Sequence, residues 1–259
     1  MRYLPQIDAK SGLKYVLLLQ LALAGLLIAT QIFGIMPKLY EEKVELPNGP
    51  VSPGDQRREY RTDRSLPGLV TQDGPADLSM PDKFDNRLRF EVMVVEGKGN
   101  VLLVTGQIDE GAAQRFEEQL ADMPAKPDLI ALHSPGGLVQ EAQQIGRTIR
   151  VKELPTAVLK GGVCASSCPY VLAGGLDRAV SRQGIVGLHQ HYYDQPGYMP
   201  VMFAVESIQT GQGETMEYLV EMGVDPSIMV YSLKTPPEQI YALVEEELIE
   251  TRIATKIVD

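Results

Sequence analysis

The sequence contains no tryptophan, and its 259 residues include only two cysteines and three histidines. A tetrahedral zinc site needs four ligands, and the sequence shows no cluster of residues with metal-ligand spacing, so we expect no metal. Positive charge is also scarce: 24 Lys and Arg residues against 34 Asp and Glu residues leave a net charge of −10. That balance argues against nucleic acid as a partner, because phosphate backbones attract basic surfaces. The sequence lacks a Walker-type loop and a dinucleotide fingerprint, so we expect no cofactor.

An uncharged stretch rich in Leu, Ala and Ile occupies residues 15–36. As a helix it is long enough to cross a bilayer, and Arg2, Lys10 and Lys14 precede it. We therefore expect residues 1–14 to form a cytoplasmic tail, residues 15–36 a transmembrane anchor, and the rest to lie outside the cytoplasmic membrane. A cleaved signal peptide is the alternative, although its apolar core is usually shorter.

The remainder divides by composition into two parts. Residues 37–88 are rich in Pro, Gly and charged residues, which predicts an irregular tether, and residues 89–259 predict the main domain. Within it, apolar runs and helical spacings alternate, which predicts an α/β fold with a parallel sheet. The expected strands are 90–95, 101–104, 129–132, 155–159, 179–180 and 184–188, and the expected helices are 109–123, 138–151, 169–174 and 201–222.

Three motifs each follow an expected strand of one sheet. They are His-Ser-Pro-Gly-Gly at 133–137, Gly-Gly-Val-Cys-Ala-Ser-Ser-Cys-Pro at 161–169 and Gly-Leu-His-Gln at 187–190. Ligand sites in parallel sheets lie beyond the carboxyl ends of the strands, so we expect the motifs to meet at one cavity. Together they supply a serine nucleophile, glycine N–H groups for an oxyanion hole and a histidine base, the parts of an acyl-transfer site.

For each candidate catalytic residue there is an alternative role or an alternative residue. Ser166 is the expected nucleophile, but a serine before a helix also serves as a cap, and Ser167 is a second candidate nucleophile. His189 is the expected base, and His191 lies on the same face of any extended run. His133 precedes the glycine turn and is expected to be a packing residue.

The motifs, with 101–108 and Ala-Gly-Gly at 173–175, resemble the proteolytic subunit of Clp protease over about residues 100–191. They are closer to membrane-anchored or periplasmic Clp-protease-like proteins of bacteria, which carry a similar Cys-x-Ser-x-Cys arrangement. This resemblance implies a repeated β-β-α superhelix of the Clp-protease and crotonase type. It also implies a Ser166–His189 pair, with the backbone N–H groups of Gly137 and Ser167 as oxyanion hole. Peptides or unfolded proteins would be the substrates, and several copies of the chain would assemble into a homo-oligomer.

Clp-type peptidases use a catalytic triad of serine, histidine and an acid. The sequence departs from this family at the acid. The family's aspartate position falls on Ile240, so candidates for the acid are Glu238, Asp225 and Asp194. Without the acid, the orientation and tautomer of the imidazole are less well fixed. This departure bears on efficient peptidase activity more than on the fold.

Cys164 and Cys168 flank Ser166 two residues on either side. Outside the cytoplasm a disulfide between them is allowed, and we expect one if the backbone brings the two Cα atoms within about 7 Å. Two half-buried thiols are the alternative.

The sequence therefore predicts a serine peptidase tethered to the bacterial inner membrane, with its catalytic domain in the periplasm. One alternative is an inactive scaffold of the same fold that binds peptides or partners. A crotonase-like acyl-thioester enzyme is a further alternative, which the extracytoplasmic placement disfavours.

Overall fold

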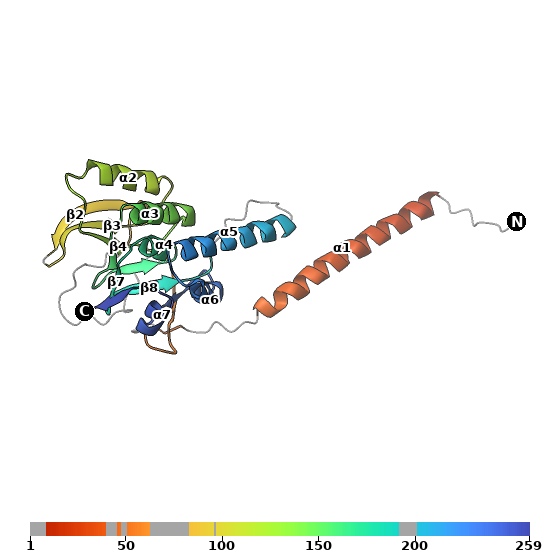
Figure 1. Ribbon diagram of the computed structural model, residues 1–259. Helices are drawn as coiled ribbons and strands as arrows, with labels where there is room; N and C mark the ends of the chain where they lie inside the picture. The colour runs from red at the N-terminus through yellow and green to blue at the C-terminus, as the bar shows by residue number, and fades with distance from the viewer. Residues whose placement is uncertain (1–8, 40–45, 48–50, 63–82, 96, 192–200) are drawn as a thin grey trace. The chain divides into compact units, whose positions relative to one another are not determined.

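The computed structural model describes residues 9–39, 46–47, 51–62, 83–95, 97–191 and 201–259 (Figure 1). The chain divides into two compact units, Met1–Glu45 and Leu46–Asp259. Each unit is described by itself below.

In the described part of the first unit, residues 9–39, the chain forms the helix α1 (Ala9–Leu39). Its apolar part, Ser11–Thr30, has 20 residues and a mean hydropathy of 1.9, long and apolar enough to cross a membrane. The helix begins before and ends after the predicted span of 15–36. A signal sequence has the same properties, so the alternative of cleavage stays open.

The second unit is built on a six-stranded sheet in the order β10-β7-β5-β4-β3-β2. Only the β2–β3 hairpin is antiparallel, and the other neighbours are parallel, as the alternation of strands and helices predicts. The strands are β2 (Arg89–Val95), β3 (Gly99–Thr105), β4 (Leu129–His133), β5 (Thr156–Val158), β7 (Arg178–Ser181) and β10 (Lys256–Val258).

A second sheet of four strands has the order β1-β9-β8-β6. Its strands are β1 (Arg57–Glu59), β6 (Val163–Ala165), β8 (Ile185–Leu188) and β9 (Gln239–Ala242). Strands β6 and β8 pair in parallel, whereas β9 runs antiparallel to both β8 and β1.

The presence of two sheets corrects the prediction of a single one. The chain leaves β5 through a turn at Gly161, whose φ is 80°, and the N–H of Gly162 donates back to the carbonyl of Leu159 at 2.8 Å. This turn carries the chain from the six-stranded sheet into the four-stranded one. The order strand, strand, helix then occurs twice, as β5-β6-α4 and as β7-β8-α5.

Helices cover one face of the six-stranded sheet, but not every helix takes part. Those of the second unit are α2 (Ala112–Asp122), α3 (Val139–Val151), α4 (Cys168–Ala173), α5 (Val201–Glu221), the 3-10 turn η1 (Pro226–Ile228), α6 (Met229–Leu233) and α7 (Glu245–Glu250). Helices α2, α3 and α4 form the layer over the sheet, with α2 packed against α3 and α3 against α4 (Figure 1). Leu102 and Val104 point toward this helical layer, and Val101 and Leu103 point toward the opposite face, because side chains of a strand alternate.

Part of the segment predicted as a tether belongs to the folded domain. Strand β1 lies within residues 37–88 and pairs with β9. Tyr60, Phe84 and Leu88 of the same segment are buried. The prediction was wrong for these residues because one short strand and a few aromatic residues are held by partners far away in sequence, which composition does not show.

Candidate functional site

Ser166 stands at a sharp bend between β6 and α4. Its φ of 61° lies in the left-handed region, which costs a residue with a side chain on the order of 1–3 kcal/mol. Its backbone N–H donates to the carbonyl of Gly187 on the neighbouring strand at 3.0 Å, which holds the bend in place. The hydroxyl consequently projects from the end of β6 and lines a cavity.

His189 follows the end of β8 and faces Ser166. Its Nε2 lies 2.8 Å from Ser166 Oγ, so the structure brings together the two residues that the sequence predicted as nucleophile and base. Its carbonyl accepts a hydrogen bond of 2.6 Å from Ser232 Oγ, and the N–H of Gln190 donates to the carbonyl of Thr235 at 2.9 Å. These bonds fix the backbone that carries the imidazole.

The imidazole of His189 is held neutral. Burial is the largest cause that lowers its pKa, to about 4, and the neighbouring His191 lowers it further, whereas the nearby backbone of Gln190 raises it. An imidazole with this pKa is unprotonated at neutral pH, so its Nε2 can accept the proton of Ser166.

No acid occupies the other side of His189 among the residues that the structure describes. Its Nδ1 is buried and lacks a hydrogen-bond partner there. Asp225 instead caps η1 by accepting the Ser227 N–H at 2.9 Å, and Glu238 is exposed. Asp194 lies outside the described residues. Ile240, at the family's aspartate position, is fully buried in β9.

Ser134 anchors the glycine turn to the Ser166 bend. Its backbone N–H donates to the carbonyl of Val163 at 2.7 Å, and its carbonyl accepts from the N–H of Ala165 at 3.0 Å. Its hydroxyl donates to the carbonyl of Gly106 at 2.6 Å and accepts the N–H of Gly136 at 3.1 Å. The turn after β4 is therefore bonded both to β6 and to Gly106 at the end of β3.

The N–H of Gly137 points away from the neighbouring segment around Ile108. Ile108 pairs with the carbonyl of Gly136 and the N–H of Leu138, at 2.8 Å each. In a parallel bridge such as this one, the residue between the two bonded groups directs its own N–H to the opposite side. Gly137 also lines the cavity that contains Ser166 and His189, which is the arrangement required of an oxyanion donor.

Ser167 differs from Ser166 in its surroundings. Its hydroxyl is buried, has no hydrogen-bond partner among the described residues and does not line the cavity. Its backbone N–H lies close to Gly136, because a Cβ built on Gly136 would come within 2.8 Å of that nitrogen. This geometry fits Ser167 to the role of backbone donor better than to that of nucleophile.

The cavity at Ser166 has a volume of about 1030 Å³ and is lined mainly by polar residues. Its walls come from the turn after β3, the start of α3, the middle of α5 and the segment after β1. The lining includes Gln107, Gln140, Gln143, Gln144, Glu110, Glu141, Glu214 and Arg61. A volume of this size accommodates several residues of an extended peptide.

The two other histidines have different surroundings. His191 lines the same cavity and its Nε2 lies 2.7 Å from the hydroxyl of Tyr170, while burial lowers its pKa. His133 accepts the Val163 N–H at its Nδ1 and packs against Phe84, with ring centroids 5.0 Å apart. It is a packing residue, as predicted.

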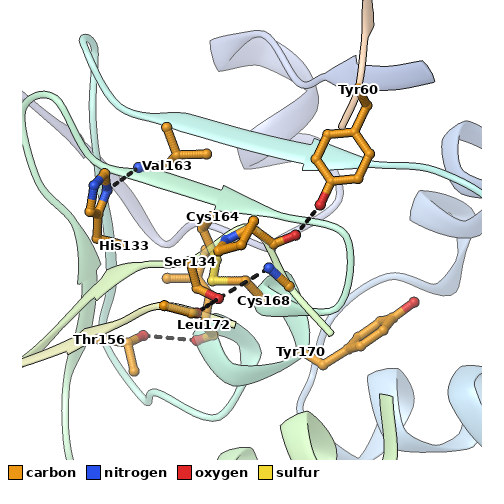
Figure 2. Close-up of a disulfide and its surroundings, with 12 residues drawn as sticks. Tyr60, His133, Ser134, Thr156, Val163, Cys164, Cys168, Tyr170 and Leu172 are labelled. Atoms are coloured by element: carbon orange, nitrogen blue, oxygen red, sulfur yellow. Dashed lines mark hydrogen bonds between the residues drawn. A yellow bond between two sulfur atoms is a disulfide. The ribbon is translucent and has the colours of Figure 1, made fainter. Parts of the chain in front are cut away.

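Cys164 and Cys168 form a disulfide, as the sequence predicted. Their Cα atoms are 5.1 Å apart and both side chains are fully buried, the first in β6 and the second at the start of α4. Figure 2 shows the bridge beneath the turn that follows Ser134. The bond thus closes the bend on which Ser166 stands.

Tyr60 is the site residue that the sequence reasoning missed. It comes from the segment after β1, is only 5% exposed, and lines the cavity beside Ser166 and His189. Its hydroxyl donates to the carbonyl of Pro135 (Figure 2). One tyrosine in a polar stretch gives no signal of this role in the sequence.

Comparison of the sequence with models of known protein families and with curated proteins found no match to either.

Proposed function

We propose that this chain is a serine hydrolase, and specifically a peptidase that works through an acyl-enzyme. The observation that carries the proposal is the 2.8 Å contact between Ser166 Oγ and His189 Nε2 at the wall of a large cavity. The left-handed backbone of Ser166 supports it, because a strained, exposed bend before a helix is typical of nucleophilic serines.

The chemistry follows from these positions. Ser166 Oγ attacks the carbonyl carbon of the scissile bond while His189 Nε2 takes the hydroxyl proton. The oxyanion accepts hydrogen bonds from the N–H groups of Gly137 and Ser167. When the intermediate collapses, the C–N bond breaks and His189 returns the proton to the leaving amine. Water then attacks the acyl-enzyme by the same route in reverse, which releases the acid and restores Ser166.

The placement of this activity is part of the proposal. Helix α1 would anchor the protein in the bacterial inner membrane, with the second unit in the periplasm. The Cys164–Cys168 disulfide supports an oxidising compartment, because such bonds are rare in the cytoplasm. The fold would be the Clp-protease type, which the two consecutive strand-strand-helix units support.

The partners proposed are peptides or unfolded proteins as substrates, and further copies of the chain. The Gln and Glu side chains that line the cavity can form hydrogen bonds with a peptide backbone, and the apolar part of its lining can contact the side chains of the peptide.

A second candidate is a scaffold of the same fold that binds peptides without cleaving them. The observation that favours it is the unpaired Nδ1 of His189, since the acid of a triad is missing there among the described residues.

Covalent labelling distinguishes the two. The full-length protein in detergent is treated with a fluorophosphonate probe, and the modified peptide is found by mass spectrometry. A hydrolase gives a single adduct on Ser166. The Ser166→Ala variant gives none, and His189→Ala lowers the labelling rate by about 100-fold or more, because general-base catalysis contributes on that order.

The control is Ser167→Ala, which removes a buried hydroxyl that does not line the cavity. It should label at nearly the wild-type rate. Absence of any adduct on the folded wild-type protein would favour the scaffold, and an adduct on Ser167 would move the nucleophile by one residue.

A further inference from the structure

We propose that Tyr60 is a positioning residue that holds the imidazole of His189, a task that the acid performs in a triad. The proposal rests on the proposed function, because the imidazole needs a fixed direction only if it acts as a base toward Ser166.

The geometry places the phenol against both members of the pair. The ring centroids of Tyr60 and His189 are 4.9 Å apart, with the planes tilted by 45°. The hydroxyl of Tyr60 donates to the carbonyl of Pro135, in the glycine turn, and also reaches the side chain of Ser166. One side chain therefore touches the base, the nucleophile and the turn that carries Gly137.

Tyr60 is itself firmly held. Strand β1, just before it, pairs with β9 over three residues, and the N–H of Tyr60 donates to the carbonyl of Glu238 at 2.9 Å. Its ring belongs to a buried cluster with Phe84 and Ile240. A ring fixed in this way can restrain the side chain that it contacts.

His189 needs such a restraint. In a triad the acid bonds to Nδ1 and fixes the direction and tautomer of the ring, whereas here Nδ1 has no partner among the described residues. Packing of Tyr60 on the imidazole limits rotation about its side-chain bonds, so Nε2 stays directed at Ser166. The aromatic face also attracts the imidazolium that forms when the proton moves, since cations are stabilised over aromatic rings.

The attraction between the ring of Tyr60 and the imidazolium matters because His189 is buried. It lowers the pKa of His189 to about 4, which disfavours the imidazolium needed during attack. An aromatic contact offsets part of that cost without adding a negative charge to a buried site.

Two variants separate the ring of Tyr60 from its hydroxyl. Tyr60→Phe keeps the ring and loses the hydroxyl, with its bond to Pro135 and its contact with Ser166. A hydrogen bond is worth about 1 kcal/mol, so the labelling rate should fall by only about fivefold. Tyr60→Leu removes the ring, and its rate should fall by about 100-fold, the effect of a small misplacement of a reacting group. The rate is measured with the fluorophosphonate probe on the full-length protein.

Phe84→Leu is the matched control. Phe84 lies in the same segment and the same buried cluster, and it packs on His133 as Tyr60 packs on His189. This variant should lose a similar amount of thermal stability while keeping the labelling rate of Ser166. Equal losses of rate in Phe84→Leu and Tyr60→Leu would mean a merely structural role and would overturn the proposal, as would a wild-type rate in Tyr60→Leu.

A second readout does not depend on activity. Nitrogen-15 NMR of the histidine side chains in the full-length protein reports the tautomer and titration of His189. The wild type and Tyr60→Phe should show one neutral tautomer with the proton on Nδ1. Tyr60→Leu should show a mixture of tautomers and a pKa that rises toward 6.5, because water reaches the ring.

The two readouts separate failure of the function from failure of the inference. If the wild type does not label, the proposed function fails, and the NMR experiment alone then decides about Tyr60. An unchanged His189 signal in Tyr60→Leu would overturn the positioning role whatever the probe shows.

Discussion

The contact between the glycine turn and the Ser166 bend can be tested by adding one methyl group to Gly136. This residue has a φ of 95°, where a side chain is strained. A Cβ placed there would lie 2.5 Å from the Cβ of Ser166, 2.6 Å from the carbonyl oxygen of Ala165 and 2.8 Å from the backbone nitrogen of Ser167. Two of these three atoms belong to the backbone, so they cannot move aside by changing a rotamer.

The magnitude of the effect has two parts. A left-handed conformation costs alanine about 1–2 kcal/mol relative to glycine. Overpacking of a tight site by one methyl group adds about 1–3 kcal/mol. We therefore expect Gly136→Ala to lower the free energy of unfolding by about 2–5 kcal/mol. Where the domain remains folded, the turn must separate from the bend, which moves Gly137 relative to Ser166.

Gly223→Ala provides the comparison. Gly223 follows α5 with a φ of 69°, and a Cβ there would meet nothing within 4 Å. The Gly223→Ala variant therefore has only the conformational cost of about 1–2 kcal/mol, because its added Cβ overlaps with no neighbouring atom. The difference between the two variants isolates the close approach at the site.

The assay combines urea unfolding with fluorophosphonate labelling of the folded fraction. Gly136→Ala should label at least about 100-fold more slowly than wild type, since displacement of an oxyanion donor costs about that much, whereas Gly223→Ala should label normally. Equal stability of the two variants, together with normal labelling of Gly136→Ala, would refute the reasoning that the turn and the bend form one rigid unit.

Three further predictions concern protonation, the disulfide and the anchor. Burial lowers the pKa of both His133 and His189 to about 4, against about 6.5 when unfolded, so the unfolded chain binds more protons between these values and stability is lost as pH falls. Each histidine should lower the free energy of unfolding by about 2 kcal/mol at pH 5 relative to pH 8, as measured by urea unfolding. His133→Phe should remove part of this pH dependence. A free energy of unfolding that does not change with pH would contradict the burial of the two side chains. Replacing Cys164 and Cys168 together by alanine should cost only about 2 kcal/mol of unfolding free energy, because the loop is short, yet slow the labelling of Ser166 about tenfold, and an unchanged labelling rate would argue against a role at the bend. An uncleaved α1 should keep the protein in the membrane fraction after a carbonate wash, whereas a mature N-terminus near Thr30 or Lys38 would indicate a cleaved signal peptide.

Much of the six-stranded sheet could be predicted from the sequence because its signals are local. Apolar runs such as 129–132 and helical spacings such as 138–151 correspond closely to β4 and α3. The motif residues could be predicted for the same reason. Gly136, Gly137 and the small residues 165–167 stand next to expected strands, where a sharp turn of the chain needs residues of this kind.

Strand β8 of the four-stranded sheet was expected at 184–188, but the sheet itself could not be predicted because its pairings join distant segments. Strand β1 has three residues, and Arg58 pairs with Ile240, 182 positions away. No periodicity is visible in three residues, and the charged Arg57–Glu59 sequence is typical of a loop. Tyr60 was missed with it, since its contacts with Pro135 and His189 exist only after β1 has paired.

The conformation of Ser166 bears on the choice between hydrolase and scaffold. A bend with a φ of 61° is least costly for glycine, and a scaffold that only binds peptides gains nothing from a serine there. The chain nevertheless places a serine at this position, encloses it between Cys164 and Cys168, and directs its hydroxyl at a neutral imidazole. Each of these features restricts the geometry of one hydroxyl group. Local strain that the surrounding structure maintains in this way is typical of reacting groups, and it favours the hydrolase even without a partner on Nδ1 among the described residues.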